Sequence, residues 1–148
     1  MKKSKCFTLI ELMVVIVILG ILAAVIAPRI PQFVNKAKEG KTKGNLGTLR
    51  STLNIYYSDN DGRYPIDTLA CLSPKYIKEV PQMETAVFSG VTNTHKHGPT
   101  NAVIAGGVAQ VDDTGGWVYQ NDSNNAAWGE VLVNCNGVDS TGNRWTSY

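Results

Sequence analysis

The feature that most constrains this chain is a long apolar run, residues 7–27, that contains a single carboxylate at Glu11. The run has 21 residues. As an α-helix rising about 1.5 Å per residue it would reach roughly 31 Å, which matches a bilayer core of about 30 Å. A carboxylate at the centre of a membrane helix costs about 2.5–3.5 kcal/mol. The sequence therefore predicts a membrane-spanning helix whose acid needs a partner charge from elsewhere.

Three lysines lie within residues 1–6, directly before the apolar run. They place the N-terminus on the cytoplasmic side. If the chain is cut between Cys6 and Phe7, the new α-amino group of Phe7 becomes a cation, and Glu11 becomes the fifth residue of the mature chain. An ion pair between this amine and Glu11 of a neighbouring subunit repays its desolvation only when both partners are present. Such a pair favours ordered addition of subunits.

An ordinary secretory signal is the alternative interpretation, because it also has a basic start and an apolar core. Small residues near position 27 offer sites to a signal peptidase. However, 21 residues exceed the 7–15 that are usual for the apolar part of a signal. A plain signal also has no use for Glu11.

The order Phe-Thr-Leu-Ile-Glu after a short basic leader resembles the start of type IV pilins and type II secretion pseudopilins, and Pro28 after the apolar run fits the same pattern. The likeness covers residues 2–33, roughly a quarter of the chain. In that family a prepilin peptidase cuts before the phenylalanine and methylates its amine, which here implies Phe7. Gly normally precedes the cut, whereas this chain has Cys6. The resemblance also implies that Glu11 pairs with a neighbour's N-terminus.

The resemblance implies a structural subunit and not an enzyme. It implies a single-pass precursor in the inner membrane, surrounded by lipid, that assembles with copies of itself into a helical filament. The expected partners are prepilin peptidase, the inner-membrane assembly machinery and minor pilins. The filament is either an extracellular pilus or a periplasmic pseudopilus; the alternative is a minor tip-located pilin that binds DNA or a surface ligand. Without the leader, 11 cations face 12 anions, so charge gives no sign of nucleic-acid binding.

The helix is expected to break between Gly20 and Pro28, because proline removes a backbone donor and disfavours helix before it. In the family that this chain resembles, the stretch often loses helical structure on assembly; a mere kink at Pro28 is the alternative. Helical periodicity of apolar residues resumes over 30–57. The turn at 58–62 ends the helix, and its acidic residues do not match an EF-hand loop.

The rest of the chain predicts an α+β fold in which the second half of the long helix packs against a small antiparallel sheet, as in the pilin fold. Residues 102–105 and 108–111 flank Gly106 and Gly107 and predict a hairpin. Residues 117–119 and 131–133 predict a second pair of strands. The expected organisation is a leader at 1–6, a transmembrane and filament-core helix at 7–28, an amphipathic second half at 29–58 and a globular head at 59–148.

Two cysteines remain after removal of the leader, Cys71 and Cys135. An even pair in an exported protein favours a disulfide. It would close a loop of about 64 residues and stabilise the head by roughly 4 kcal/mol in the chain-entropy model. Two buried free thiols are the alternative.

No catalytic constellation is evident, and no cofactor is expected. His95 and His97 have a spacing that allows two ligands to one metal, but no third ligand is evident, so a surface loop is favoured. The resemblance to major pseudopilins, which commonly bind calcium in a head loop, makes Asp112, Asp113 and Asp139 calcium candidates. Their local spacing does not establish a site.

Overall fold

The computed structural model describes residues 7–148. Tertiary contacts divide the chain into two compact units, Met1–Val34 and Asn35–Tyr148. The described part of the first unit, residues 7–34, is called the N-terminal segment below, and the second unit is called the head. The basic leader and Cys6 lie outside the described residues.

The N-terminal segment is helical from Leu9 onward. Helix α1 spans Leu9–Ile26 and begins after Thr8, which acts as its N-cap. Every residue from 7 to 34 is exposed, because the side chains are apolar around the whole helix and no part of the described chain covers them. By length and composition, this stretch is the one part of the described chain able to cross a membrane as a helix. It therefore needs lipid or other helices around it.

The helix changes at Pro28 but not at Gly20. A single 3₁₀ turn, Ala27–Arg29, separates α1 from α2, which spans Ile30–Asp59. Proline is tolerated at the first positions of a helix, because a backbone N–H at these positions has no acceptor within the helix and its loss costs no hydrogen bond. Gly20 lies inside α1, so the predicted break does not extend to it in this structure. A glycine weakens a helix by about 1 kcal/mol but does not block it sterically.

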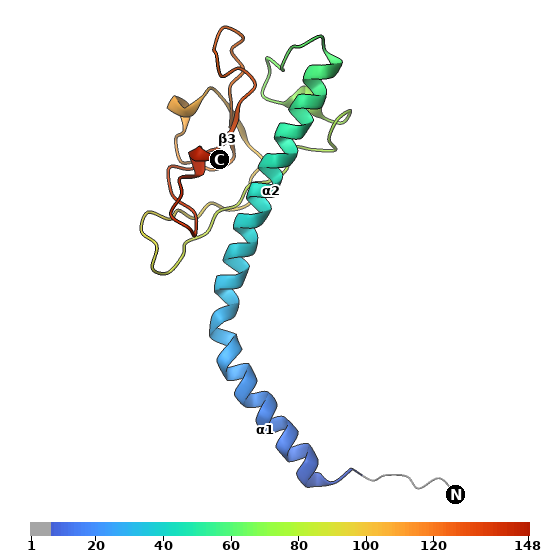
Figure 1. Ribbon diagram of the computed structural model, residues 1–148, viewed down its shortest axis with the longest axis vertical. Coiled ribbons are helices and arrows are strands. Elements are labelled where there is room, and N and C mark those ends of the chain that lie inside the picture. Colours follow the sequence, from blue (N-terminus) through green and yellow to red (C-terminus); the bar gives the residue numbers. More distant parts are fainter. Residues whose placement is uncertain (1–6) are drawn as a thin grey trace, which may run out of the picture. The chain divides into compact units, whose positions relative to one another are not determined.

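The part of α2 within the head packs on a small sheet, as the sequence predicts (Figure 1). Leu46, Leu49 and Leu53 form its buried stripe and are at most 2% exposed. Steps of three and four residues place them on one face. They share one core cluster with residues of two strands: Trp117, Tyr119, Val131 and Val133.

The sheet has three short strands, β1 (Val103–Ala105), β2 (Trp117–Tyr119) and β3 (Val131–Val133), in the order β1-β2-β3. Strands β2 and β3 pair antiparallel, as predicted. Strand β1 pairs with β2 in parallel, so the sheet is mixed and the prediction of a purely antiparallel sheet is wrong.

The predicted hairpin at Gly106 and Gly107 is also absent. Val108–Gln110 forms a 3₁₀ turn in place of a second strand. The side chain of Gln110 accepts a hydrogen bond of 2.8 Å from the backbone N–H of Gly107, which closes the turn locally. Strand β1 finds its partner in β2, farther along the chain.

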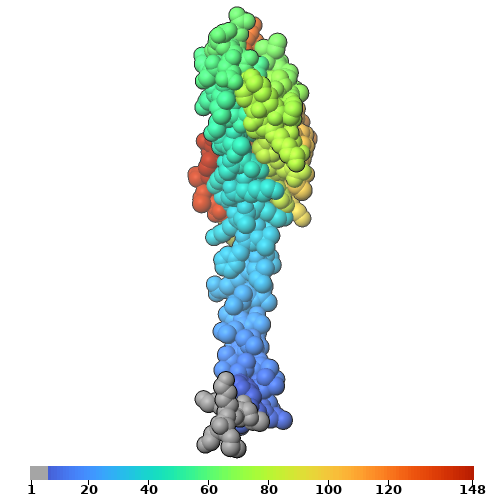
Figure 2. All heavy atoms as spheres, turned by 90° about the vertical axis from the view of Figure 1, so that its right-hand side faces the viewer, coloured from blue at the N-terminus to red at the C-terminus, as the bar shows by residue number. Residues whose placement is uncertain are grey.

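Loops after α2 are fastened to the sheet and the helix by side-chain hydrogen bonds. The indole N–H of Trp117 donates to the carbonyl of Pro81 at 2.7 Å, and the hydroxyl of Tyr119 donates to that of Pro65 at 2.7 Å. In Figure 2 the loop residues, in light green, cover one side of α2 within the head. Leu69 and Leu72 of these loops are fully buried.

The C-terminal segment closes the core. Trp145 lies in a last 3₁₀ turn, Trp145–Ser147, and is 1% exposed. The guanidinium of Arg50, on α2, donates to the carbonyls of Val131 on β3 and of the final residue, Tyr148. The arginine thus connects the helix, the edge strand and the end of the chain.

Candidate functional site

Glu11 forms a capping box with Thr8 at the start of α1. The backbone N–H and the hydroxyl of Thr8 donate to Glu11 Oε2 at 2.8 and 2.7 Å. In return, the N–H of Glu11 donates to the threonine hydroxyl at 3.3 Å. Among the described residues no donor reaches Oε1. The carboxylate is therefore half satisfied within its own chain and keeps one oxygen for a donor from another molecule.

The surroundings of Glu11 are apolar. It borders a shallow hollow on the helix surface, lined also by Phe7, Ile10, Val14 and Val15. Phe7 is 75% exposed and lies about one helical turn before Glu11. The structure thus places the two predicted assembly residues on the same end of α1, within reach of a neighbouring molecule.

A second polar group, the Asp139 cluster, lies in the head and consists of Glu39, Lys43, Asp139 and Tyr148. The ammonium of Lys43 donates to Asp139 Oδ2 at 2.6 Å and to Glu39 Oε1 at 2.7 Å. The hydroxyl of Tyr148 donates to the same Asp139 oxygen. Asp139 is fully buried, and the cluster joins α2 to the C-terminal loop.

The other oxygen of Asp139 is satisfied by its own loop. Oδ1 accepts from the N–H and hydroxyl of Thr141 and from the N–H of Asn143, at 2.7 to 2.9 Å. Burial acts to raise the pKa of Asp139, but Lys43, Tyr148 and Thr141 outweigh it and hold the pKa well below its usual value. For Lys43, desolvation acts to lower the pKa, and the bonds to Asp139 and Glu39 raise it above the usual value. The structure therefore holds both groups charged.

The three calcium candidates do not come together. Asp139 is neutralised by Lys43, while Asp112 accepts from Asn134 Nδ2 at 2.7 Å within a turn. Asp113 lies beside two histidines. Within residues 7–148, no group of three or more potential metal ligands contains Asp112 or Asp139.

Asp113 instead belongs to a group of four ligand-type side chains. One atom each of His95, His97, Asp113 and Cys135 lies within 4.8 Å of the others. His95 Nδ1 is 2.7 Å from Asp113 Oδ2, and His97 Nε2 is 3.3 Å from Asp113 Oδ1. The two histidines lie in a loop, as expected, but both side chains approach Asp113, and that of His97 is only 11% exposed. The fold brings Asp113 and Cys135 to the two histidines as the third and fourth possible ligands, which the local sequence does not provide.

The predicted Cys71–Cys135 disulfide is not formed, because both thiols are free. Cys71 is exposed, and its thiol donates to Asp67 Oδ1 at 3.4 Å. Cys135 is buried beside the two histidines and Asp113. Burial raises the pKa of the Cys135 thiol to about 11, against a smaller opposing effect of the N–H that Gly137 donates to it. An even number of cysteines indicated a pair, but the fold gives each thiol a different neighbour.

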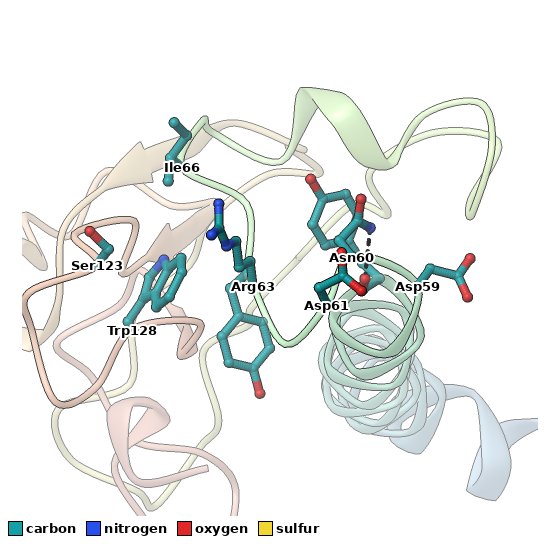
Figure 3. A pocket seen from close by; sticks show the side chains of 9 residues that line it. Asp59, Asn60, Asp61, Arg63, Ile66, Ser123 and Trp128 are labelled. Atoms are coloured by element: carbon teal, nitrogen blue, oxygen red, sulfur yellow. Dashed lines mark hydrogen bonds between the residues drawn. The ribbon is translucent and has the colours of Figure 1, made fainter.

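A groove of about 780 Å³ lies at the end of α2 in the head. Figure 3 shows Arg63 between Trp128 on one side and Asp61 on the other, with Asp59 beyond Asp61 at the end of α2. Its walls come from the helix end and from two later loops, so local sequence patterns did not indicate it. The lining carries two carboxylates and one guanidinium, and Asp59 also pairs with Lys75 at 3.6 Å, so the groove has no excess of positive charge.

Comparison with known proteins agrees with the N-terminal pattern. The family described as "Prokaryotic N-terminal methylation motif" matches residues 1–27. The type II secretion system core protein G of Dickeya chrysanthemi is 31% identical over 143 residues, which cover 84% of this chain and 93% of that protein. The chain belongs to the family of type II secretion system core protein G. The resemblance read from residues 2–33 is thereby confirmed, and it extends through the head.

Other members of the family show how far each likeness reaches. The core protein G of Klebsiella michiganensis is 32% identical over 135 residues, 78% of this chain and 94% of that protein. The type IV major pilin protein PilA of Myxococcus xanthus is 39% identical over 59 residues, 40% of this chain and 27% of that protein. No solved structure shows significant similarity to the chain. The two core G proteins thus match along 93% and 94% of their own length, whereas PilA matches along 27% of its length.

Proposed function

We propose that this chain is a structural subunit of a type II secretion pseudopilus. The observation that carries the proposal is the extent of the likeness to core protein G, which includes the head as well as the apolar helix. The pilin relative matches over only 27% of its own length. The fimbrial protein EcpC of Eikenella corrodens matches over 63% of its own length and 63% of this chain. The pilus alternative therefore rests on likenesses that cover less of the chain than those to core protein G.

The chain would be made as a precursor anchored in the inner membrane by α1. A prepilin peptidase would cut between Cys6 and Phe7 and methylate the amine of Phe7. Cys6 lies outside the described residues, and the family motif that matches residues 1–27 supports this processing. All side chains of residues 7–34 are exposed. Large exposed apolar surfaces need to be covered. Lipid would cover this helix in the precursor, and neighbouring helices would cover it once the subunit has entered the filament core.

Glu11 would set the register of each incoming subunit. Its Oε2 is occupied by Thr8, while Oε1 is open to a donor from another chain. The N-terminal ammonium of a neighbour's Phe7 fits this position because it is a cation at the same end of the helix. The two Thr8 bonds reduce the cost of the lone acid in lipid, since burial of a polar group is expensive mainly when it lacks hydrogen bonds.

The stretch from Gly20 to Pro28 would be the part of the helix that yields during assembly. The 3₁₀ turn Ala27–Arg29 already departs from α-helical bonding. Gly20 is the weakest helix former within α1. Melting between these points would let the first part of α1 adjust to its neighbours while the head keeps its place.

The other partners proposed are the inner-membrane assembly machinery and minor pilins, with no cofactor needed for the filament itself. The groove in Figure 3 does not support a tip-located subunit that binds DNA, because its lining has Asp59 and Asp61 against the one guanidinium of Arg63. The long-range electrostatic attraction on which nucleic-acid binding depends is missing there.

The Glu11 proposal is tested by the variant Glu11→Gln in a host with a working secretion system. We expect the variant to be cut before Phe7 and inserted, but to give a filament yield well below wild type, because a neutral amide cannot neutralise an ammonium. The matched control is Thr8→Val, which removes the hydroxyl bond but keeps the carboxylate, and should assemble. Mass spectrometry of the N-terminus and yield of sheared filaments are the measurements. Wild-type yield from Glu11→Gln would contradict the pairing.

Deletion of the chain separates the two filament types. A pseudopilus subunit predicts loss of exoprotein secretion without loss of surface fibres. Abundant surface fibres built from this chain, with secretion unchanged after deletion, would assign it to a type IV pilus.

A further inference from the structure

In the head, two imidazoles, one carboxylate and one thiol lie close together. The proposed filament function assigns no role to these four side chains. The four residues come from three segments that are distant in sequence: the loop with His95 and His97, the turn with Asp113, and the segment that follows β3, with Cys135. Their ligand atoms lie within 4.8 Å of one another. We propose that His95, His97, Asp113 and Cys135 form a zinc site.

The donor set selects zinc. Zn²⁺ prefers four ligands from cysteine, histidine and carboxylate in a tetrahedron, with bonds of about 2.0–2.3 Å, so that its donor atoms lie about 3.3–3.8 Å apart. Ligand atoms within 4.8 Å need only a small contraction to reach this arrangement. Calcium and magnesium require several oxygen ligands, and this group offers only the carboxylate of Asp113. A thiolate together with two imidazoles favours zinc over these hard cations.

The backbone around the two histidines is fixed by Thr85, which is 1% exposed. Its hydroxyl accepts from the N–H of His97 at 3.0 Å and donates to the carbonyl of His95 at 2.8 Å. Alternate residues of an extended segment point to the same side, so this anchoring directs both imidazoles toward Asp113. Outer-shell bonds of this kind orient metal ligands.

The acidic and sulfur ligands are also held in place. The Oδ1 atom of Asp113 accepts a hydrogen bond from the backbone N–H of Asn136 at 2.9 Å. The backbone N–H of Asp113 donates to Asn134 Oδ1 at 3.3 Å. Cys135 Sγ accepts from the N–H of Gly137 at 3.3 Å. A backbone donor to sulfur is compatible with a metal-bound thiolate. The turns that carry these two ligands are therefore ordered before any metal enters.

Two glycines make room for the imidazole rings. A Cβ at Gly115 would lie 3.2 Å from the Cβ of His97, and a Cβ at Gly137 would lie 3.0 Å from the Cγ of His95. A side chain at either position would therefore make a contact tighter than usual, and the histidine would have to shift by a few tenths of an ångström. The close approach of backbone and rings indicates a shaped pocket rather than an accidental meeting of polar side chains.

A bound zinc ion would join the three segments, which is the function that the predicted disulfide was expected to serve. A ligand that binds only the folded state stabilises it in proportion to the logarithm of its concentration. The thiol of Cys135 would be a ligand, and Cys71 would remain a free surface thiol.

The test uses the full chain in detergent, stripped of metal with a chelator and dialysed. We expect one zinc per chain by elemental analysis and a melting temperature that rises with zinc concentration. Cobalt in place of zinc should give the visible spectrum of a tetrahedral site with a thiolate charge-transfer band. Absence of stoichiometric zinc, or a cobalt spectrum without the thiolate band, would overturn the proposal. Both readouts are independent of filament assembly.

Variants assign the ligands. Cys135→Ser and His97→Gln should each weaken zinc binding by more than about 100-fold, beyond the 10–100-fold typical of a lost outer-shell partner. The matched controls are Cys71→Ser and Asp112→Asn, which alter the same residue types outside the group and should bind as wild type does. Equal loss in Cys71→Ser and Cys135→Ser would refute the assignment. If Cys135→Ser fails to fold, the partly exposed His95 offers His95→Gln as a replacement.

Discussion

Removal of the Lys43 ammonium should destabilise the head more than any other single change of a surface lysine. Asp139 has no exposed side-chain area, whereas the side chain of Lys43 is 29% exposed. In Lys43→Met the aliphatic stem is kept, and the buried carboxylate loses its only cation within 3 Å among the described residues. Glu39 loses the same partner. The expected effect is therefore the cost of an uncompensated buried anion.

The magnitude follows from the burial of the pair. Breaking a buried ion pair by removal of one partner costs about 3–5 kcal/mol. Partial exposure of Lys43 reduces this through solvent screening, and Tyr148 and Thr141 still donate to Asp139. We expect a loss of about 2–3 kcal/mol in the free energy of unfolding. For a domain of this size, each 1 kcal/mol lowers Tm by roughly 3–6 °C.

Tryptophan fluorescence is the suitable assay, because Trp117, Trp128 and Trp145 are the three tryptophans of the chain and all lie in the head. The control is Lys41→Met, an exposed lysine on the same helix, which should change stability by less than about 0.5 kcal/mol. A double-mutant cycle with Asp139→Asn isolates the pair. Equal stability of Lys43→Met and Lys41→Met would refute the reasoning.

The effect should also depend on pH. The pKa of Asp139 is lowered in the folded state, so its contribution is present above its unfolded pKa of about 3.9 and is lost as the pH falls through the folded value. The pKa of Lys43 is raised, so its contribution is present below about 10.4 and is lost as the pH rises through the folded value. The difference between wild type and Lys43→Met should be constant near neutrality and shrink below about pH 4.

Two further predictions concern the head. Tyr119→Phe removes the hydroxyl that donates to Pro65 and should lower the unfolding free energy by about 1–2 kcal/mol, measured by chemical denaturation; an unchanged midpoint would contradict the role of this bond. Millimolar calcium, or its chelation by EGTA, should leave Tm unchanged, because Lys43 already neutralises Asp139; a calcium-dependent rise in Tm would show that the ammonium yields to the ion.

The sequence predicted those parts of the fold that depend on local patterns. Apolar periodicity indicated the long helix, proline indicated the change at Pro28, and β-branched and aromatic runs indicated β2 and β3. The parallel pairing of β1 with β2 escaped prediction because it joins segments on opposite sides of a turn that looked like a hairpin. Glycine pairs permit several turns, and tertiary partners decide among them.

The candidate sites show the same division. Glu11 could be singled out from the sequence because a lone acid in an apolar helix is chemically conspicuous. The pair Lys43–Asp139 joins residues 96 positions apart, and the group around Asp113 draws its ligands from three separate segments. The local spacing of His95 and His97 does not indicate that Cys135 lies beside them in the fold. Such groups become visible only once the chain is folded.

The threonine that caps α1 has a bearing on how a polymer of this chain comes apart. When a subunit leaves its neighbours, its Glu11 carboxylate does not enter lipid without hydrogen bonds. The hydroxyl and backbone N–H of Thr8 still donate to it. The acid exchanges one partner for another instead of losing all of them. Addition and loss of a subunit would then differ by a modest free energy, so that the proposed assembly machinery, and not the strength of one bond, would set the direction.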